Sequence, residues 1–130
     1  MSDDELFQTN ELSRPASARL VHKALQQAER GEVKAAVKTL QRAVDLDPRA
    51  APLERLGEMW LELNQPERAI IPLAAAVTLD PKGGAAASLA FAFMRLRRER
   101  EANAMAKIAL KRRPGDRKAL EVFEATRDDD

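Results

Sequence analysis

The side chains that could carry out covalent chemistry are few in this 130-residue chain. There is one histidine, His22, no cysteine or tyrosine, and only a few scattered serines. Nucleophilic catalysis needs a nucleophile beside a base that a third group orients. His22 has no carboxylate at metal-ligand spacing beside it and is predicted to be a surface or groove residue. The sequence therefore predicts no enzyme activity, no metal site and no cofactor.

Composition disfavours several other classes of protein. Without cysteine there are no disulfides and no thiolate metal sites. Gly83-Gly84 lacks the lysine and the preceding strand of a phosphate-binding loop. No stretch approaches the roughly 20 apolar residues of a membrane span, and the acidic first residues show no secretory signal. Net charge is only +1, which gives no general attraction to nucleic acid or membrane. We expect a soluble, cytoplasmic protein.

Residues 53–81 contain two amphipathic helical patterns. In the first, large apolar residues recur at spacings of three and four, as at Leu53, Leu56 and Trp60. A break at residues 64–66 precedes the second pattern, and Asp80-Pro81 ends it, because proline disfavours the helical conformation in the residue before it. The stretch predicts a helix–turn–helix hairpin. Pro72 lies inside the second helix and is expected to bend it, at a cost of about 3 kcal/mol.

This hairpin occurs three times. Pro48, Pro81 and Pro114 are spaced 33 residues apart, and the apolar and small residues before them keep the same register. The predicted repeats are 16–48, 50–81 and 83–114, and a capping helix is predicted over 115–127. Stacked helical repeats of this number can bury a continuous core.

The repeat resembles the tetratricopeptide repeat (TPR) family. The family pattern of Trp-x2-Leu-Gly-x2-Tyr, then Ala-x3-Phe, then Pro corresponds to Leu53, Leu56-Gly57, Trp60, Ala69, Leu73 and Pro81. Two departures are the leucine in place of the first tryptophan and a period of 33 where the family has 34. The resemblance implies an all-α, right-handed α-solenoid of three hairpins with a capping helix. It also places Trp60 and Phe93 in the core.

The two ends are predicted to lie outside the repeat domain of residues 15–127. Residues 1–14 are acidic and carry few large apolar groups, so we expect a mobile arm. The alternative is that Leu6 and Phe7 fold back onto the domain or pair with another molecule. Ser13-Arg14-Pro15 is predicted to start the first repeat helix. Residues 128–130 form an acidic tail whose charge opposes the helix dipole, so fraying is expected there.

The resemblance implies that the first helix of each pair lines a concave groove. Carrying over the family's groove positions gives a surface that is apolar at both ends and acidic in its centre. The predicted groove residues are Val21, His22, Leu25, Glu54, Arg55, Glu58, Leu61, Glu62, Ser88, Phe91, Met94 and Arg95.

Two features of this groove leave alternatives open. The three glutamates of the second repeat share one helix face and either attract a basic residue of a partner or form a solvated face. In the second case Arg55, or Arg95 and Arg98, would neutralise them in part. Phe91 and Met94 either form an apolar anchor pocket or pack against the capping helix or the amino-terminal arm.

One peptide-binding mode of the family is not supported by the sequence. Chaperone-binding relatives hold an acidic carboxyl-terminal tail in a clamp of lysine, asparagine and arginine. The corresponding positions here are Val21, Leu25, Arg55, Gly84 and Ser88. The clamp is missing, so an acidic chaperone tail is not expected as the partner.

The third hairpin is strongly basic. Its patch could contact phosphates or an acidic protein surface, or it could be solvated. Aromatic stacking residues are absent from it, which disfavours nucleic acid as a partner. The patch residues are Arg97, Arg98, Arg100, Lys111, Arg112 and Arg113.

These observations favour a non-catalytic adaptor that binds an extended or helical segment of another protein in its groove. One alternative is a chaperone of the secretion type, which would hold a client protein. The other is a scaffold that self-associates through the acidic arm and the basic third repeat.

Overall fold

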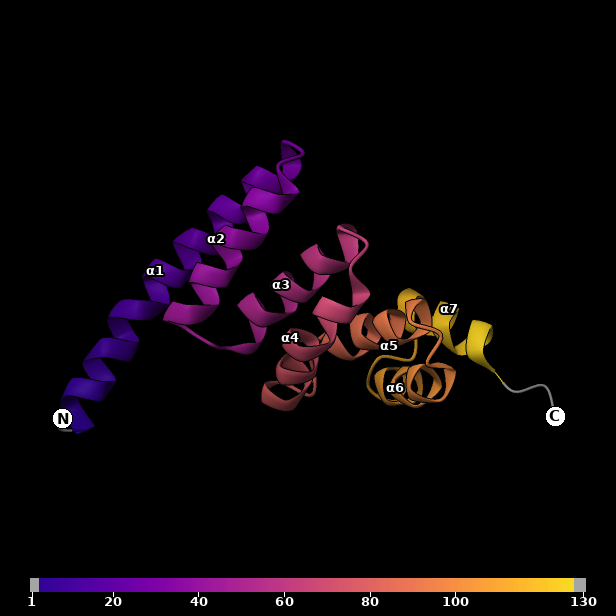
Figure 1. The fold of residues 1–130 in the computed structure, drawn as a ribbon. Coiled ribbons are helices and arrows are strands. Elements are labelled where there is room, and N and C mark those ends of the chain that lie inside the picture. Colours follow the sequence, from indigo (N-terminus) through magenta and orange to yellow (C-terminus); the bar gives the residue numbers. More distant parts are fainter. Residues whose placement is uncertain (1–2, 128–130) are drawn as a thin grey trace.

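The computed structural model describes residues 3–127, and the side chains of residues 12–127. The predicted acidic tail at 128–130 lies outside this range. The described chain is all-α, with seven helices and no strand (Figure 1). They are α1 (Asp3–Glu29), α2 (Val33–Leu46), α3 (Ala50–Glu62), α4 (Pro66–Leu79), α5 (Ala85–Arg95), α6 (Glu99–Arg112) and α7 (Arg117–Thr126).

The helices form three consecutive hairpins and a final cap. Each hairpin consists of two helices that pack together, α1 with α2, α3 with α4 and α5 with α6 (Figure 1). Successive hairpins contact each other through α2 and α3 and through α4 and α5. The last helix, α7, covers α5 and α6. The predicted architecture of three stacked hairpins with a capping helix is confirmed.

The turn inside each hairpin has the same geometry in all three repeats. A residue with positive φ follows the first helix in each case: Gly31 (84°), Asn64 (59°) and Arg97 (61°). The next backbone N–H donates to the carbonyl five residues earlier at 2.9 Å, Glu32 to Gln27, Gln65 to Trp60 and Arg98 to Phe93. This is the Schellman closure, which satisfies carbonyls that the helix end leaves unpaired. Glycine is the residue for which this conformation costs least, so the two later repeats adopt it at a cost.

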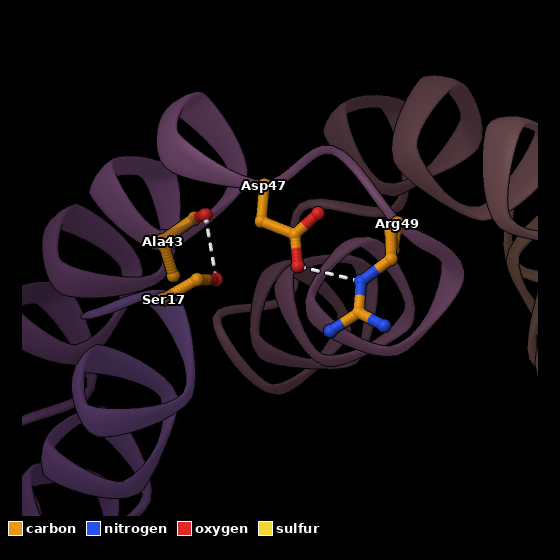
Figure 2. Close-up of polar contacts among 4 residues, drawn as sticks. All are labelled: Ser17, Ala43, Asp47 and Arg49. Atoms are coloured by element: carbon orange, nitrogen blue, oxygen red, sulfur yellow. Dashed lines mark hydrogen bonds and ion pairs between the residues drawn. The ribbon is translucent and has the colours of Figure 1, made fainter. Parts of the chain in front are cut away.

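The second helix of each hairpin also ends in the same way. The residue before each predicted proline is extended, and its N–H donates to the carbonyl four residues earlier: Asp47 to Ala43, Asp80 to Ala76 and Arg113 to Ala109. In the first repeat the Ala43 carbonyl also accepts a 2.8 Å hydrogen bond from the buried Ser17 hydroxyl of α1 (Figure 2). Beside it, the Asp47 carboxylate pairs with Arg49 at 2.5 Å (Figure 2). The three prolines therefore stand in equivalent surroundings.

A small residue on the first helix of each hairpin faces the second helix. The buried residues at these equivalent positions are Ala24, Gly57 and Ala90 on the first helices and Leu40, Leu73 and Ala106 on the second. A Cβ atom added at Gly57 would lie 2.4 Å from Leu73 Cγ. The two helices of the middle repeat therefore approach as closely as they do because position 57 has no side chain.

Trp60 and Phe93, predicted as core residues, are only partly buried. Each packs against the central core cluster, and an arginine covers the outer face of each ring. The guanidinium of Arg68 lies 5.0 Å from the Trp60 centroid, and that of Arg98 lies 5.0 Å from the Phe93 centroid. The arginines shield aromatic edges that the neighbouring helices leave open.

The predicted start of the first repeat helix at Ser13 is wrong, because α1 is helical from Asp3. The backbone of residues 3–14 therefore continues the repeat helix in place of an irregular arm. Pro15 lies within the helix on its exposed side, where water can bind the carbonyl that its missing N–H leaves free.

α4 runs continuously from Pro66 to Leu79 through Pro72, and the predicted bend there stays a prediction. The Pro72 ring is buried, and nothing in the structure explains why a proline stands there.

The close approach at Gly57 predicts the effect of a small substitution. Gly57→Ala should lower the free energy of unfolding. Overpacking a core costs about 1–3 kcal/mol, whereas replacing a helical glycine by alanine gains roughly 1 kcal/mol at most through helix propensity. The overpacking cost is therefore the larger effect. Gly57→Ala with Leu73→Ala should lose less than the sum of the two single losses, since the clash is then gone. Urea unfolding measures both effects. Gly115→Ala, with no atom within 4 Å of its added Cβ, is the control and should change stability by less than about 0.5 kcal/mol. An unchanged Gly57→Ala variant would contradict the packing described.

Candidate functional site

A hollow on the concave side lies between α3, α5 and α7. Its volume is about 250 Å³, and its lining residues are Glu58, Leu61, Glu62, Phe91 and Lys118. Four of these were predicted as groove residues. Lys118 of α7 was not among the predicted groove residues, because no periodic signal relates α7 to the acidic face of α3.

Two apolar side chains, Leu61 and Phe91, line this hollow, and both pack against core clusters. Leu61 packs against the central core cluster. Phe91 and Met94 pack against a second cluster that includes Val122 and Phe123 of α7. α5, α6 and α7 all contribute to this cluster, against which both side chains are half-buried. Phe91 also lines the hollow, so it is available to a partner as well.

Charges of both signs surround the hollow. Arg55 pairs with Glu58 at 3.6 Å, whereas Glu62 makes no ion pair with the described side chains. On the opposite side, Arg95 lies 5.6 Å from the centroid of Phe91 and donates a hydrogen bond to Asn64 Oδ1. The acidic side of α3 is therefore only partly neutralised, and Glu62 is the carboxylate left for a partner.

Glu54 lies one turn before Glu58 on the same face and is half-buried. Burial raises the pKa of the Glu54 carboxyl above its ordinary value, and the Glu58 carboxylate raises it further. The positive charges of Arg55, Arg113 and Lys118 oppose this rise without cancelling it. Holding Glu54 ionised in the folded protein therefore costs free energy at neutral pH.

Ser88 is a wrong prediction, because α7 covers it. Its exposed fraction is 2%, and Lys118 Nζ lies 3.2 Å from its hydroxyl. The neighbouring Ala87 is buried in the same contact between α5 and α7. The third repeat therefore offers Phe91, Met94 and Arg95 to the groove but not Ser88.

The first repeat contributes little to the hollow. Val21 and Leu25 are half-buried and pack against the central core cluster, and His22 is exposed. None of the three lines the hollow, because α1 barely contacts α3. The structure thus concentrates the predicted groove residues of the second and third repeats and separates those of the first.

Much of the predicted basic patch is engaged within the chain. Arg98 pairs with Glu101. Arg112 and Arg113 donate hydrogen bonds to the carbonyls of Pro81 and Lys82. The remaining members have other surroundings: Arg97 is the left-handed turn residue, Arg100 borders a hollow of about 620 Å³ between α6 and α7, and Lys111 is exposed.

Over the described range, no three or more histidine, aspartate or glutamate side chains are grouped so that they could hold a metal ion. None of the described helices is long and apolar enough to cross a membrane.

Solved structures share this fold. No protein-family model and no curated protein matches the chain. The TPR domain of Arabidopsis OM64 matches with a TM-score of 0.83 and 23% identity over 88% of this chain and 97% of that one. The first TPR of Spaghetti (RPAP3), bound to the HSP90 peptide SRMEEVD, matches with a TM-score of 0.83 and 17% identity, over 87% and 91%. MamA matches with a TM-score of 0.78 and 19% identity, over 85% of this chain and 61% of that one.

The raised pKa of Glu54 predicts a pH-dependent gain from its removal. Glu54→Gln should raise the melting temperature at neutral pH, because the cost of a half-buried carboxylate disappears. The gain should shrink as the pH falls through the raised pKa of Glu54, since the wild-type group is then protonated in the folded state. Thermal melts from pH 7 downward measure the difference. Glu121→Gln, at an exposed position of α7, is the matched control. A gain that grows on acidification would contradict the assignment.

Proposed function

The chain has the fold of a tetratricopeptide repeat domain, and from this premise we propose that it is a non-catalytic module that binds a segment of a partner protein in its concave groove. The observation that carries the proposal is the hollow between α3, α5 and α7. This hollow is open to solvent and is lined by both apolar and charged groups, the combination that can hold an apolar side chain of a partner and orient it through a charge.

The lining of the hollow defines the partner's chemistry. Leu61 and Phe91 offer an apolar surface to one aliphatic or aromatic side chain of a partner. Glu62 has no ion pair of its own among the described side chains, so a lysine or arginine of the partner gains a charge-assisted contact there. We therefore propose a segment with a basic residue and a large apolar residue on the same face. The two are three or four residues apart if the segment is helical and two residues apart if it is extended.

The charges differ from those needed for an acidic tail. The Spaghetti (RPAP3) domain is bound to the HSP90 peptide SRMEEVD, which carries two glutamates and an aspartate. Here the positions of the family's clamp hold half-buried Val21 and Leu25 and fully buried Ser88. Acidic residues of α3 face the same groove. The shared fold therefore does not bring the shared ligand. The same groove would serve a secretion-type chaperone, but no observation favours that second role.

The missing clamp predicts a negative result with a defined peptide. Titration of the peptide SRMEEVD into the full chain should give no binding at concentrations up to the millimolar range in calorimetry. The reason is that its carboxylates meet Glu54, Glu58 and Glu62, while the clamp positions carry no lysine or asparagine. Micromolar binding of this peptide would contradict the proposed chemistry of the groove.

Selection from a pool of random peptides tests the positive side of the proposal. Peptides retained by the immobilised chain should be enriched in lysine or arginine near leucine, phenylalanine or methionine. Glu62→Lys should raise the dissociation constants of the retained peptides by about tenfold, which corresponds to a loss of about 1.4 kcal/mol in binding free energy. Phe91→Glu should abolish their binding.

Ile71→Glu provides the matched control, because it adds a carboxylate at a side chain that is 79% exposed on α4. Its peptide affinities should equal those of the wild type, and circular dichroism should show that all three variants are folded. Equal loss of binding in Ile71→Glu, or no loss in a folded Glu62→Lys variant, would place the binding surface elsewhere.

A further inference from the structure

A second hollow lies outside the concave groove, at the junction of the first two repeats. Its volume is about 220 Å³, and its lining residues are Lys34, Val37, Lys38, Trp60, Leu63 and Gln65. At the corresponding place in the next junction Arg98 replaces Gln65, and its guanidinium covers the ring of Phe93. Gln65 carries no charge. Arg68 covers one face of the Trp60 ring at 5.0 Å, and Trp60 also lines the hollow.

The chemistry of this hollow favours an acidic segment with one large apolar side chain. Its walls are the half-buried Trp60 and Leu63 and the nearly buried Val37. Lys34 and Lys38 are exposed one turn apart and make no ion pair with the described side chains, and like charges at this spacing repel mildly. The volume lies below the range of about 300–1,000 Å³ that is usual for small-molecule sites, so a single side chain fits better than a cofactor.

The chain itself has a segment of this kind. Ser17 of α1 contacts Ala43, close to the end of α2, so the antiparallel α1 extends past α2 over residues 3–13 (Figure 1). This extension begins Asp3-Asp4-Glu5-Leu6-Phe7, and Leu12 on it is 76% exposed. The acidic residues at its start are complementary in charge to Lys34 and Lys38.

The amino-terminal segment cannot reach the hollow of its own chain. The 27 residues of α1 span about 40 Å at 1.5 Å per residue, and the hollow lies at the far end, where Lys34 follows the turn that joins α1 to α2. Two α1 helices placed side by side and antiparallel would bring each amino terminus to the other chain's turn. Such an arrangement is two-fold symmetric, so it closes as a dimer.

We propose that two copies of this chain form an isologous dimer in which residues 3–7 of each copy occupy the hollow between α2 and α3 of the other. The carboxylates of the segment meet Lys34 and Lys38, and one of its large apolar side chains lies against Trp60. This surface is separate from the concave groove, so the inference does not depend on the proposed function. It also differs from pairing of the acidic segment with the third hairpin, where Arg98, Arg112 and Arg113 already have partners.

Sedimentation equilibrium of the full chain tests the dimer. The wild type should associate to a dimer, and added salt should weaken it by screening the charges. Lys34→Glu/Lys38→Glu should raise the dimer dissociation constant by at least about 100-fold, or about 2.7 kcal/mol. Lys107→Glu/Lys111→Glu makes the same charge change on the exposed side of α6 and should leave the dimer intact. A wild type that stays monomeric, or dissociation by the second pair of substitutions instead of the first, would overturn the proposal.

Trp60, the only tryptophan of the chain, reports on the hollow directly. The full chain is held at a concentration at which the chain is monomeric, and the synthetic peptide MSDDELFQTNEL is titrated into it. The Trp60 emission should change, and the change should saturate with peptide concentration. The Lys34→Glu/Lys38→Glu variant should show no such change, and a scrambled peptide of the same composition should bind at least tenfold more weakly. Equal binding of the scrambled peptide would overturn the assignment to this segment and indicate a general site for acidic chains.

Discussion

The close contact between Gly57 and Leu73 holds the two helices of the middle hairpin together, and the remaining features depend on it. Ala24, Gly57 and Ala90 stand at one position of the repeat, and in the middle repeat an added methyl group would overlap Leu73. Helices that approach this closely have a fixed separation and crossing, which stacks the hairpins in register. The register in turn brings α3, α5 and α7 around one hollow. A looser pairing would leave Glu62 and Phe91 on the surface without a common site.

The fold and the charges contribute separately to function. The three solved structures of similar fold described above are 17–23% identical to this chain, and one of them is bound to an acidic peptide. Among the described side chains, Glu62 near the hollow between α3, α5 and α7 makes no ion pair, and neither do Lys34 and Lys38 at the junction of the first two repeats. The backbone provides the surfaces, and the residues at a few repeat positions determine which chemistry each surface accepts.

The repeats could be predicted from the sequence because every signal for them is local. The 33-residue spacing of Pro48, Pro81 and Pro114 reflects turns and helix ends that the structure repeats with the same hydrogen bonds. The length of α1 could not be predicted, because Ser13 and Pro15 suggest a helix start, whereas an exposed proline is tolerated within a helix. The burial of Ser88 and the approach of Lys118 were also missed, since both depend on how α7 packs on α5. Assignment of the groove residues to partner binding and the cytoplasmic location stay predictions.

Chemical-shift mapping by NMR, with ¹⁵N-labelled full chain and the tightest peptide from the random pool, tests the central claim most directly. The account predicts that the largest amide shifts on peptide addition fall at residues 58–62 of α3, at Phe91 of α5 and at Lys118 of α7, while α4 and α6 stay unchanged. Shifts centred on α4 and α6, with residues 58–62 unaffected, would show that the partner binds the opposite side of the stack and would contradict it.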